Sequence, residues 1–191
     1  MASVLPRLMT AEEFHDWTHR PENRDRHFEL EEGEVVEMSL PGERHCAVCS
    51  NANGILWTYT RERKKGYVCS NDMGLILQRD PDTVRGPHVA VFLESRKLAD
   101  LDLKYPERMP DLVVDVLSPN DRRASMQKRV SKFPASGVAM VWVLDPDEES
   151  VTVYLPNQPP IGLEGDEEVT GFGVLADFRC KASDFFVMPE E

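Results

Sequence analysis

An acidic side chain interrupts an apolar run near the middle of the sequence. The segment PDLVVDVLSP (110–119) places Asp115 among branched apolar residues, a pattern typical of a buried strand. A second apolar run, TVRGPHVAVF (83–92), carries His88 directly after a proline. If the two strands are neighbours, His88 and Asp115 can meet near the strand ends, because side chains alternate along each strand. A carboxylate beside an imidazole has perturbed protonation, which is a common mark of a functional site.

The segment that follows Asp115 supplies candidate partner cations. Residues 120–137 (NDRRASMQKRVSKFPASG) predict a helix that ends near Pro134 and Gly137. Two interpretations remain open: a functional site, and a buried ion pair that only holds strand to helix. The helix would place one of three cations over the edge that holds the carboxylate, namely Lys128, Arg129 or Lys132.

The elements that must position these residues follow from the flanking patterns. Thr10 begins a capping box that predicts a short helix. Alternation on both sides of Glu32-Gly33 predicts a β-hairpin. Residues 46–65 predict a long helix with a basic last turn, ended by Gly66. Strands are expected at residues 67–78, 83–94, 110–118, 138–146 and 150–156.

The order of these elements predicts an α/β (α+β) fold with a mixed central sheet, helices on both of its faces and an N-terminal β-hairpin. The strand–helix–strand unit from Asp111 to Asp145 should form a right-handed parallel crossover. Because no repeat or linker interrupts the pattern, we expect a single domain over residues 1–191.

The composition limits the classes of function. The chain has 22 basic and 34 acidic residues, a net charge of −12, which argues against nonspecific nucleic-acid binding through a broad basic surface. Any such binding must therefore be local. No apolar run approaches the ~20 residues of a membrane span, and the N-terminus lacks the apolar core of a signal peptide. These features predict a cytoplasmic protein with no membrane partner.

The cysteines include one C-x-x-C pair, Cys46 and Cys49. A zinc site of the usual kind needs a second close pair, and the sequence has none. Spacing of three places both thiols on one helix face, so we expect them to serve packing rather than metal or redox chemistry.

An ordered series of motifs resembles a known family. The runs FELEEGEVVEMSLPGERH, TVRGPHVAVF and PDLVVDVLSPNDR, followed by KRVSKFPASGV, VWVLDP and VTVY, are similar to the Uma-two-type restriction endonucleases. That family is a branch of the PD-(D/E)XK nuclease superfamily. The resemblance covers residues 10–186. It implies a restriction-endonuclease-like core that hydrolyses phosphodiester bonds of DNA with a divalent metal, magnesium or manganese.

The resemblance also implies site residues, with substitutions at three of them. The acid of the family's Pro-Asp strand corresponds to His88, and its glutamate corresponds to Asp115. The superfamily's lysine would be Leu117. This branch supplies that lysine from the next helix, where an ungapped count places it at Arg129.

Two further positions match the family directly. Glu29 corresponds to the hairpin acid, and His45 to the histidine that opens the first long helix. For Glu29 the alternative is a plain surface acid.

The substitutions alter the expected chemistry. Magnesium prefers oxygen ligands in an octahedral arrangement. The implied metal ligands are Asp115, which supplies oxygen, and His88, whose nitrogen better suits manganese, iron or zinc. Arg129 stays protonated, so it cannot act as a base, although it can stabilise an anionic transition state. His88 has three interpretations: a ligand for a softer metal, a remnant hydrogen-bonded to Asp115, or a surface histidine at a strand end.

Two classes of function follow. The first is a metal-dependent endonuclease with a degenerate active site, acting on DNA, with a homodimer among the assemblies that the sequence allows. The second is a catalytically inactive nuclease-fold domain that binds nucleic acid or a protein partner through the same cleft. A basic rim would favour nucleic acid in either case, and its candidates are Arg61, Arg63, Lys64, Lys65, Arg122, Arg123 and Lys128.

Overall fold

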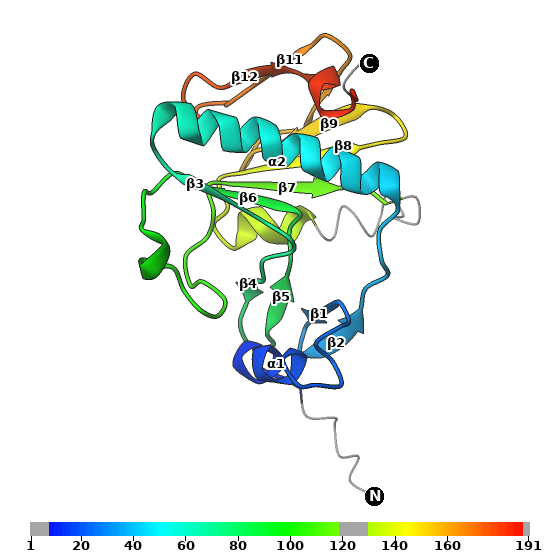
Figure 1. Ribbon diagram of the computed structural model, residues 1–191, viewed down its shortest axis with the longest axis vertical. Coiled ribbons are helices and arrows are strands. Elements are labelled where there is room, and N and C mark those ends of the chain that lie inside the picture. Colours follow the sequence, from blue (N-terminus) through cyan, green and yellow to red (C-terminus); the bar gives the residue numbers. More distant parts are fainter. Residues whose placement is uncertain (1–7, 119–129, 189–191) are drawn as a thin grey trace, which may run out of the picture.

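A computed structural model describes residues 8–118 and 130–188. Its longest helix, α2 (Glu43–Arg63), lies across a large twisted sheet (Figure 1). A smaller sheet and helix α1 (Ala11–Thr18) lie at the opposite end from the C-terminal strands β11 (Glu168–Thr170) and β12 (Arg179–Lys181). In the described ranges, no helix combines the length and apolar character that a membrane crossing requires.

The large sheet has six strands in the order β10-β9-β8-β7-β6-β3. Neighbours are antiparallel except β7 and β8, which run parallel. The sheet is therefore mixed. Its parallel pair, β7 and β8, belongs to the expected strand–helix–strand unit. The strand bounds are Tyr67–Ser70 for β3, Val89–Phe92 for β6, Leu112–Val116 for β7, Met140–Asp145 for β8, Ser150–Tyr154 for β9 and Ile161–Glu164 for β10.

Two apolar layers enclose this sheet. Every residue of β7 is buried, so its alternate side chains must enter a core on each face. Val48 and Leu56 of α2 belong to the core on one face. Phe133, in the helical residues 130–135, contributes to the core on the other face. The prediction of helices on both faces is confirmed.

The smaller sheet has four strands in the order β2-β1-β5-β4. Its first hairpin turns at Glu32 and Gly33, both with positive φ, as the alternation predicted. Helix α1 begins at the predicted capping box and buries Phe14 against this sheet. The strand bounds are Phe28–Glu31 for β1, Glu34–Glu37 for β2, Leu75–Gln78 for β4 and Thr83–Arg85 for β5.

Two predicted strands are each broken in two. The run 67–78 divides into β3 and β4, and the run 83–94 divides into β5 and β6. One half of each run pairs in the large sheet and the other half in the small one. The second break falls at Gly86-Pro87, because proline has no amide hydrogen to donate to the strand ladder. The backbone of Asp72 lies so close to Gly86 that a side chain there would collide with it.

Two local expectations for α2 are wrong. The residue in left-handed conformation that ends the helix is Lys64, two positions before Gly66. The expectation that both thiols serve packing is wrong for Cys46, which is exposed, whereas Cys49 is partly buried and packs against the core. Their spacing of three rotates one thiol toward solvent while the other faces the sheet.

Candidate functional site

A pocket of about 390 Å³ lies where the two sheets meet the first turn of α2. We call it the junction pocket. Three of the expected site residues line it: Glu29 from β1, His45 from α2, and His88 at the bend directly before β6. These segments are distant in the sequence, and the junction of the sheets brings them together.

The expected contact between His88 and Asp115 is present. The antiparallel register of β6 and β7 pairs Val89 with Val114, so the next step places His88 beside Asp115. Nδ1 of His88 lies 2.9 Å from Oδ1 of Asp115 and 3.0 Å from the amide nitrogen of Val116. The Asp115 side chain is 0% exposed, and a carboxylate in that position requires such a polar partner.

His45 is held by the backbone of the same strand. Its Nε2 lies 3.2 Å from the carbonyl oxygen of Val116, which can only accept, so Nε2 carries the proton. Its Nδ1 therefore carries a lone pair, which accepts the thiol hydrogen of Cys49 at 3.6 Å. Burial, followed by the neighbouring charge of His88, lowers the pKa of His45 and favours its neutral form.

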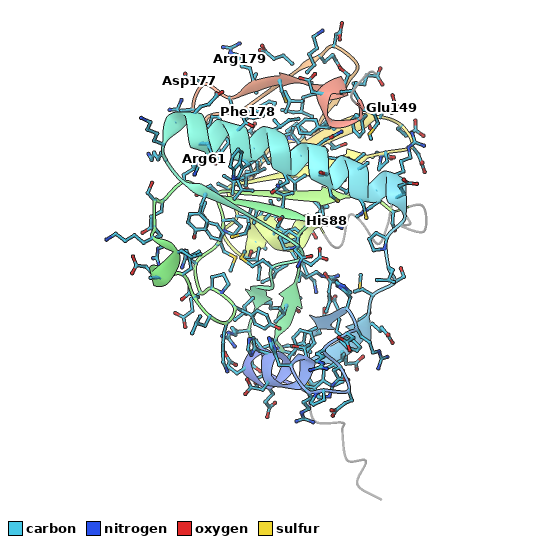
Figure 2. All side chains as sticks on the ribbon, viewed as in Figure 1. Arg61, His88, Glu149, Asp177, Phe178 and Arg179 are labelled. Atoms are coloured by element: carbon cyan, nitrogen blue, oxygen red, sulfur yellow. The ribbon has the colours of Figure 1, made fainter. Side chains whose placement is uncertain are left out.

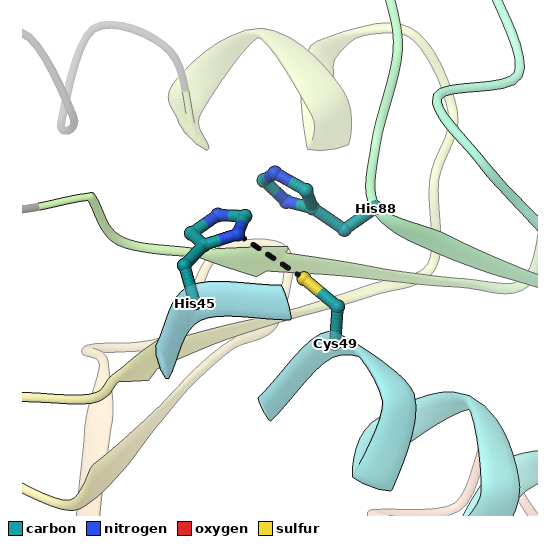
Figure 3. Close-up of side chains that lie close together, drawn as sticks. All are labelled: His45, Cys49 and His88. Atoms are coloured by element: carbon teal, nitrogen blue, oxygen red, sulfur yellow. Dashed lines mark hydrogen bonds between the residues drawn. The ribbon is translucent and has the colours of Figure 1, made fainter. Parts of the chain in front are cut away.

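Cys49 completes a group that the sequence analysis missed. A ring nitrogen of His45, a ring nitrogen of His88 and the sulfur of Cys49 all lie within 4.8 Å of one another (Figure 3). The rings of the two histidines meet edge to face, with centroids 4.5 Å apart. Burial raises the pKa of the Cys49 thiol to about 12, so it is protonated at neutral pH. The spacing of four between His45 and Cys49 was the available signal, since it aligns two side chains on one helix face.

Glu29 is a buried, paired acid. Its side chain is 8% exposed, and its Oε2 lies 2.5 Å from Nη1 of Arg85. Its Oε1 accepts from the amide of Gly86 at 3.2 Å. The alternative that Glu29 is a plain surface acid is therefore wrong. Arg85 also pairs with Glu31 at 2.5 Å, so one guanidinium joins two strands of the small sheet.

The expected cations divide into two groups. Arg129 and Lys128 lie outside the described residues. Lys132 does not contact Asp115, because its Nζ pairs with Glu31 at 2.7 Å and with Glu32 at 3.4 Å. Leu117, at the superfamily's lysine position, packs in the apolar layer around Phe133.

Within the described part of the chain, the charged side chains that line the junction pocket are acidic or histidine. The described lining residues include Glu29 and Asp72 but no lysine or arginine. The basic residues at the end of α2 are remote from it, since about 24 Å of helix separates Arg61 from His45. Figure 2 shows Arg61 well apart from His88, which lines the pocket. Of the candidates for a basic rim, the four at the end of α2 do not line this pocket: Arg61, Arg63, Lys64 and Lys65.

The donor atoms of the pocket do not fit magnesium. Magnesium needs several oxygen ligands. Here the Glu29 carboxylate is held by Arg85, and the Asp115 carboxylate is fully buried against His88. The atoms that converge instead are two imidazole nitrogens and a sulfur, which suit borderline and softer ions.

The mixed sheet and the helices on its two faces form a restriction-endonuclease-like fold. The chain belongs to the Uma2 family, described as "Putative restriction endonuclease", whose sequence profile matches residues 11–183. A crystal structure from Anabaena variabilis, described as "a putative nuclease belonging to DUF820", superposes with a TM-score of 0.77. The two sequences are 21% identical, and the superposed region covers 93% of this chain and 97% of the Anabaena chain. This likeness establishes the fold. None of the curated proteins matches this sequence.

Proposed function

We propose that this chain is an endonuclease that hydrolyses phosphodiester bonds of DNA at the junction pocket, with an active site altered from the family pattern. The observation that carries the proposal is the contact of His88 with Asp115 at the two positions where the family has acids. Family membership supports the reaction class. The four cysteines are free thiols, which is consistent with the reducing cytoplasm as its location.

In this proposal each residue keeps a separate task. Asp115 orients the His88 ring and balances positive charge in its surroundings, because a buried carboxylate acts strongly on its neighbours. His88 offers the metal a nitrogen ligand at the position where the family has an acid. Arg129 supplies a permanent positive charge for the phosphate. Glu29 and Arg85 fix the wall of the pocket formed by the small sheet.

The metal requirement follows from the donor atoms. Since the pocket offers nitrogen in place of oxygen, we expect manganese to support cleavage better than magnesium. The test is cleavage of supercoiled plasmid and of single-stranded DNA by the purified chain with each metal. Higher activity with magnesium than with manganese would contradict the assignment of His88 as a ligand.

The second candidate is a catalytically silent nuclease-fold domain that binds nucleic acid or a protein partner through the same pocket. The pairing of Glu29 with Arg85 favours it, because that acid is then engaged in structure. The two candidates separate in one experiment. If the wild type is inert with every metal, and the double variant His88→Asp/Arg129→Lys is also inert, the endonuclease proposal fails and the binding function takes its place.

A further inference from the structure

Three metal-binding side chains converge beside the junction pocket from separate parts of the fold. His45 and Cys49 come from successive turns of α2, and His88 precedes β6. Their donor atoms lie within 4.8 Å of one another. Figure 3 shows the two rings and the thiol gathered around one space. Two imidazoles and one thiol form a donor set that zinc and cobalt bind well.

The separation of the His45 and Cys49 donor atoms fits a tetrahedral ion. Zinc bonds of ~2.3 Å to sulfur and ~2.0–2.1 Å to nitrogen, at the tetrahedral angle, place those two atoms about 3.6 Å apart. Sγ of Cys49 and Nδ1 of His45 are 3.6 Å apart. An ion can therefore join this pair with no movement of α2.

The surroundings prepare the group for a cation. The Val116 carbonyl accepts from Nε2 of His45, so the other ring nitrogen faces Cys49 with its lone pair. Metal-binding histidines commonly donate their second nitrogen to a carbonyl in this way. The Asp115 carboxylate touches His88 and offsets positive charge nearby. The described lining residues of the pocket include no lysine or arginine that would repel a cation.

We propose that His45, Cys49 and His88 form a binding site for zinc or a similar borderline divalent ion such as cobalt. The ion replaces the thiol proton of Cys49, which is released to solvent, and the sulfur binds as thiolate. Because His45 and His88 line the junction pocket, the fourth coordination position faces it. Three protein ligands and one open position are the arrangement of catalytic rather than purely structural zinc sites. The site is a binding site whether or not the domain cleaves DNA.

The first test uses cobalt as a spectroscopic probe. The full chain, stripped of metal with a chelator, is titrated with Co²⁺ and followed by absorption. Wild type should develop the near-ultraviolet thiolate-to-cobalt charge-transfer band and the intense visible bands of tetrahedral cobalt, and zinc should remove both. Cys49→Ser should lose the charge-transfer band. Cys46→Ser is the matched control, because Cys46 is on the same helix and exposed, and it should titrate like wild type.

The affinity of the variants separates ligands from neighbours. Cys49→Ser and His88→Asn should each raise the dissociation constant for cobalt by more than ~10-fold. Loss of a residue that only orients a ligand already weakens metal binding by about that factor, so loss of a ligand should cost more. Circular dichroism and thermal unfolding verify that each variant is folded.

A second measurement needs no variant. The rate of alkylation of each thiol by iodoacetamide is followed by mass spectrometry with and without zinc. Zinc should strongly slow labelling of Cys49, because a thiolate bound to the metal is no longer free to attack the reagent. Cys69 and Cys180, which are also partly buried, should label at unchanged rates. Equal protection of all thiols, or no charge-transfer band in wild type, would overturn the site.

The outcomes also separate this site from the proposed function. A cobalt band without DNA cleavage upholds the metal site and counts against the endonuclease. Cleavage with manganese and no cobalt–thiolate band upholds the endonuclease and refutes the metal site.

Discussion

At the scale of single residues, the substitution of histidine at position 88 decides the chemistry of the pocket. Aspartate at this position would offer oxygen to a hard cation, whereas His88 offers nitrogen and contacts the buried Asp115. The interpretation of His88 as a surface histidine at a strand end is wrong, because its side chain is 20% exposed and bonded on its inner side. The other two interpretations, a ligand and a remnant, differ only in whether an ion binds.

The variant His88→Asp should restore a preference for magnesium, because it returns the second carboxylate to the site. Adding Arg129→Lys should increase cleavage further, since it returns a titratable amine. Asp115→Asn should abolish cleavage, because it removes the inner-strand carboxylate. Plasmid cleavage with magnesium and manganese checks all three. Asp115→Asn with the activity of wild type would remove the junction pocket from the reaction.

At the scale of elements, the small sheet and α1 form one wall of the pocket, and polar contacts fix their positions. Asp82, which precedes β5, accepts from the amide of Ala11 at 2.7 Å and so caps α1 from outside. It also accepts from Arg79 at 2.8 Å and from the amide of Asp80 at 3.1 Å. Burial opposes ionisation of this carboxyl, but the hydrogen bonds outweigh it and lower the pKa of Asp82.

Asp82→Asn should destabilise the chain by about 1–3 kcal/mol at pH 7, because a part-buried, charge-assisted contact is weakened. Urea unfolding measures the change. Asp25→Asn, on an 88%-exposed side chain, is the matched control and should lie within about 0.5 kcal/mol of wild type.

The same contact predicts a dependence on pH. Because the folded pKa of Asp82 lies below the unfolded value of ~3.9, its contribution is complete above that value and is lost as the pH falls through the folded pKa. The difference between wild type and Asp82→Asn should therefore shrink below about pH 4. A constant difference down to the acid transition would show that charge plays no part in the contact.

At the scale of the whole molecule, charge limits how the chain meets a polyanion. With a net charge of −12, nonspecific affinity for DNA should be weak and should depend on a few local cations. The described basic group at the end of α2 is directed away from the pocket, with Arg63 paired to Asp177 and Arg61 placed over Trp57. Arg122 and Arg123 follow Ser118, which lines the pocket, by four and five positions in the sequence.

Reversing the charge of Arg122 and Arg123 to glutamate should therefore weaken DNA binding and flatten its salt dependence, because phosphate contacts release counterions. The same reversal at Arg61 and Arg63 alters net charge equally and should leave binding close to wild type. Fluorescence anisotropy with a labelled duplex over a range of salt measures both. Equal losses in the two variants would place DNA binding outside the junction pocket.

Local patterns in the sequence determined much of the framework. The capping box at Thr10, the turn at Glu32-Gly33 and the periodicity of α2 are confirmed because each depends on neighbours a few residues away. The apolar run around Asp115 likewise predicted a buried strand, and strand alternation predicted its contact with His88.

Tertiary structure alone decided how the expected site residues are paired and which further residue joins them. The division of two strands between sheets depends on which sheet each half can pair with, and the burial of Glu29 depends on Arg85 from another strand. The spacing in the sequence also places His45 and Cys49 on one helix face. It does not indicate that His88, from a distant loop, lies beside them. Helix periodicity specifies which side chains share a face, whereas the packing of α2 on the sheet specifies what that face meets. That packing makes Cys49, rather than its neighbour Cys46, the third member of the cluster.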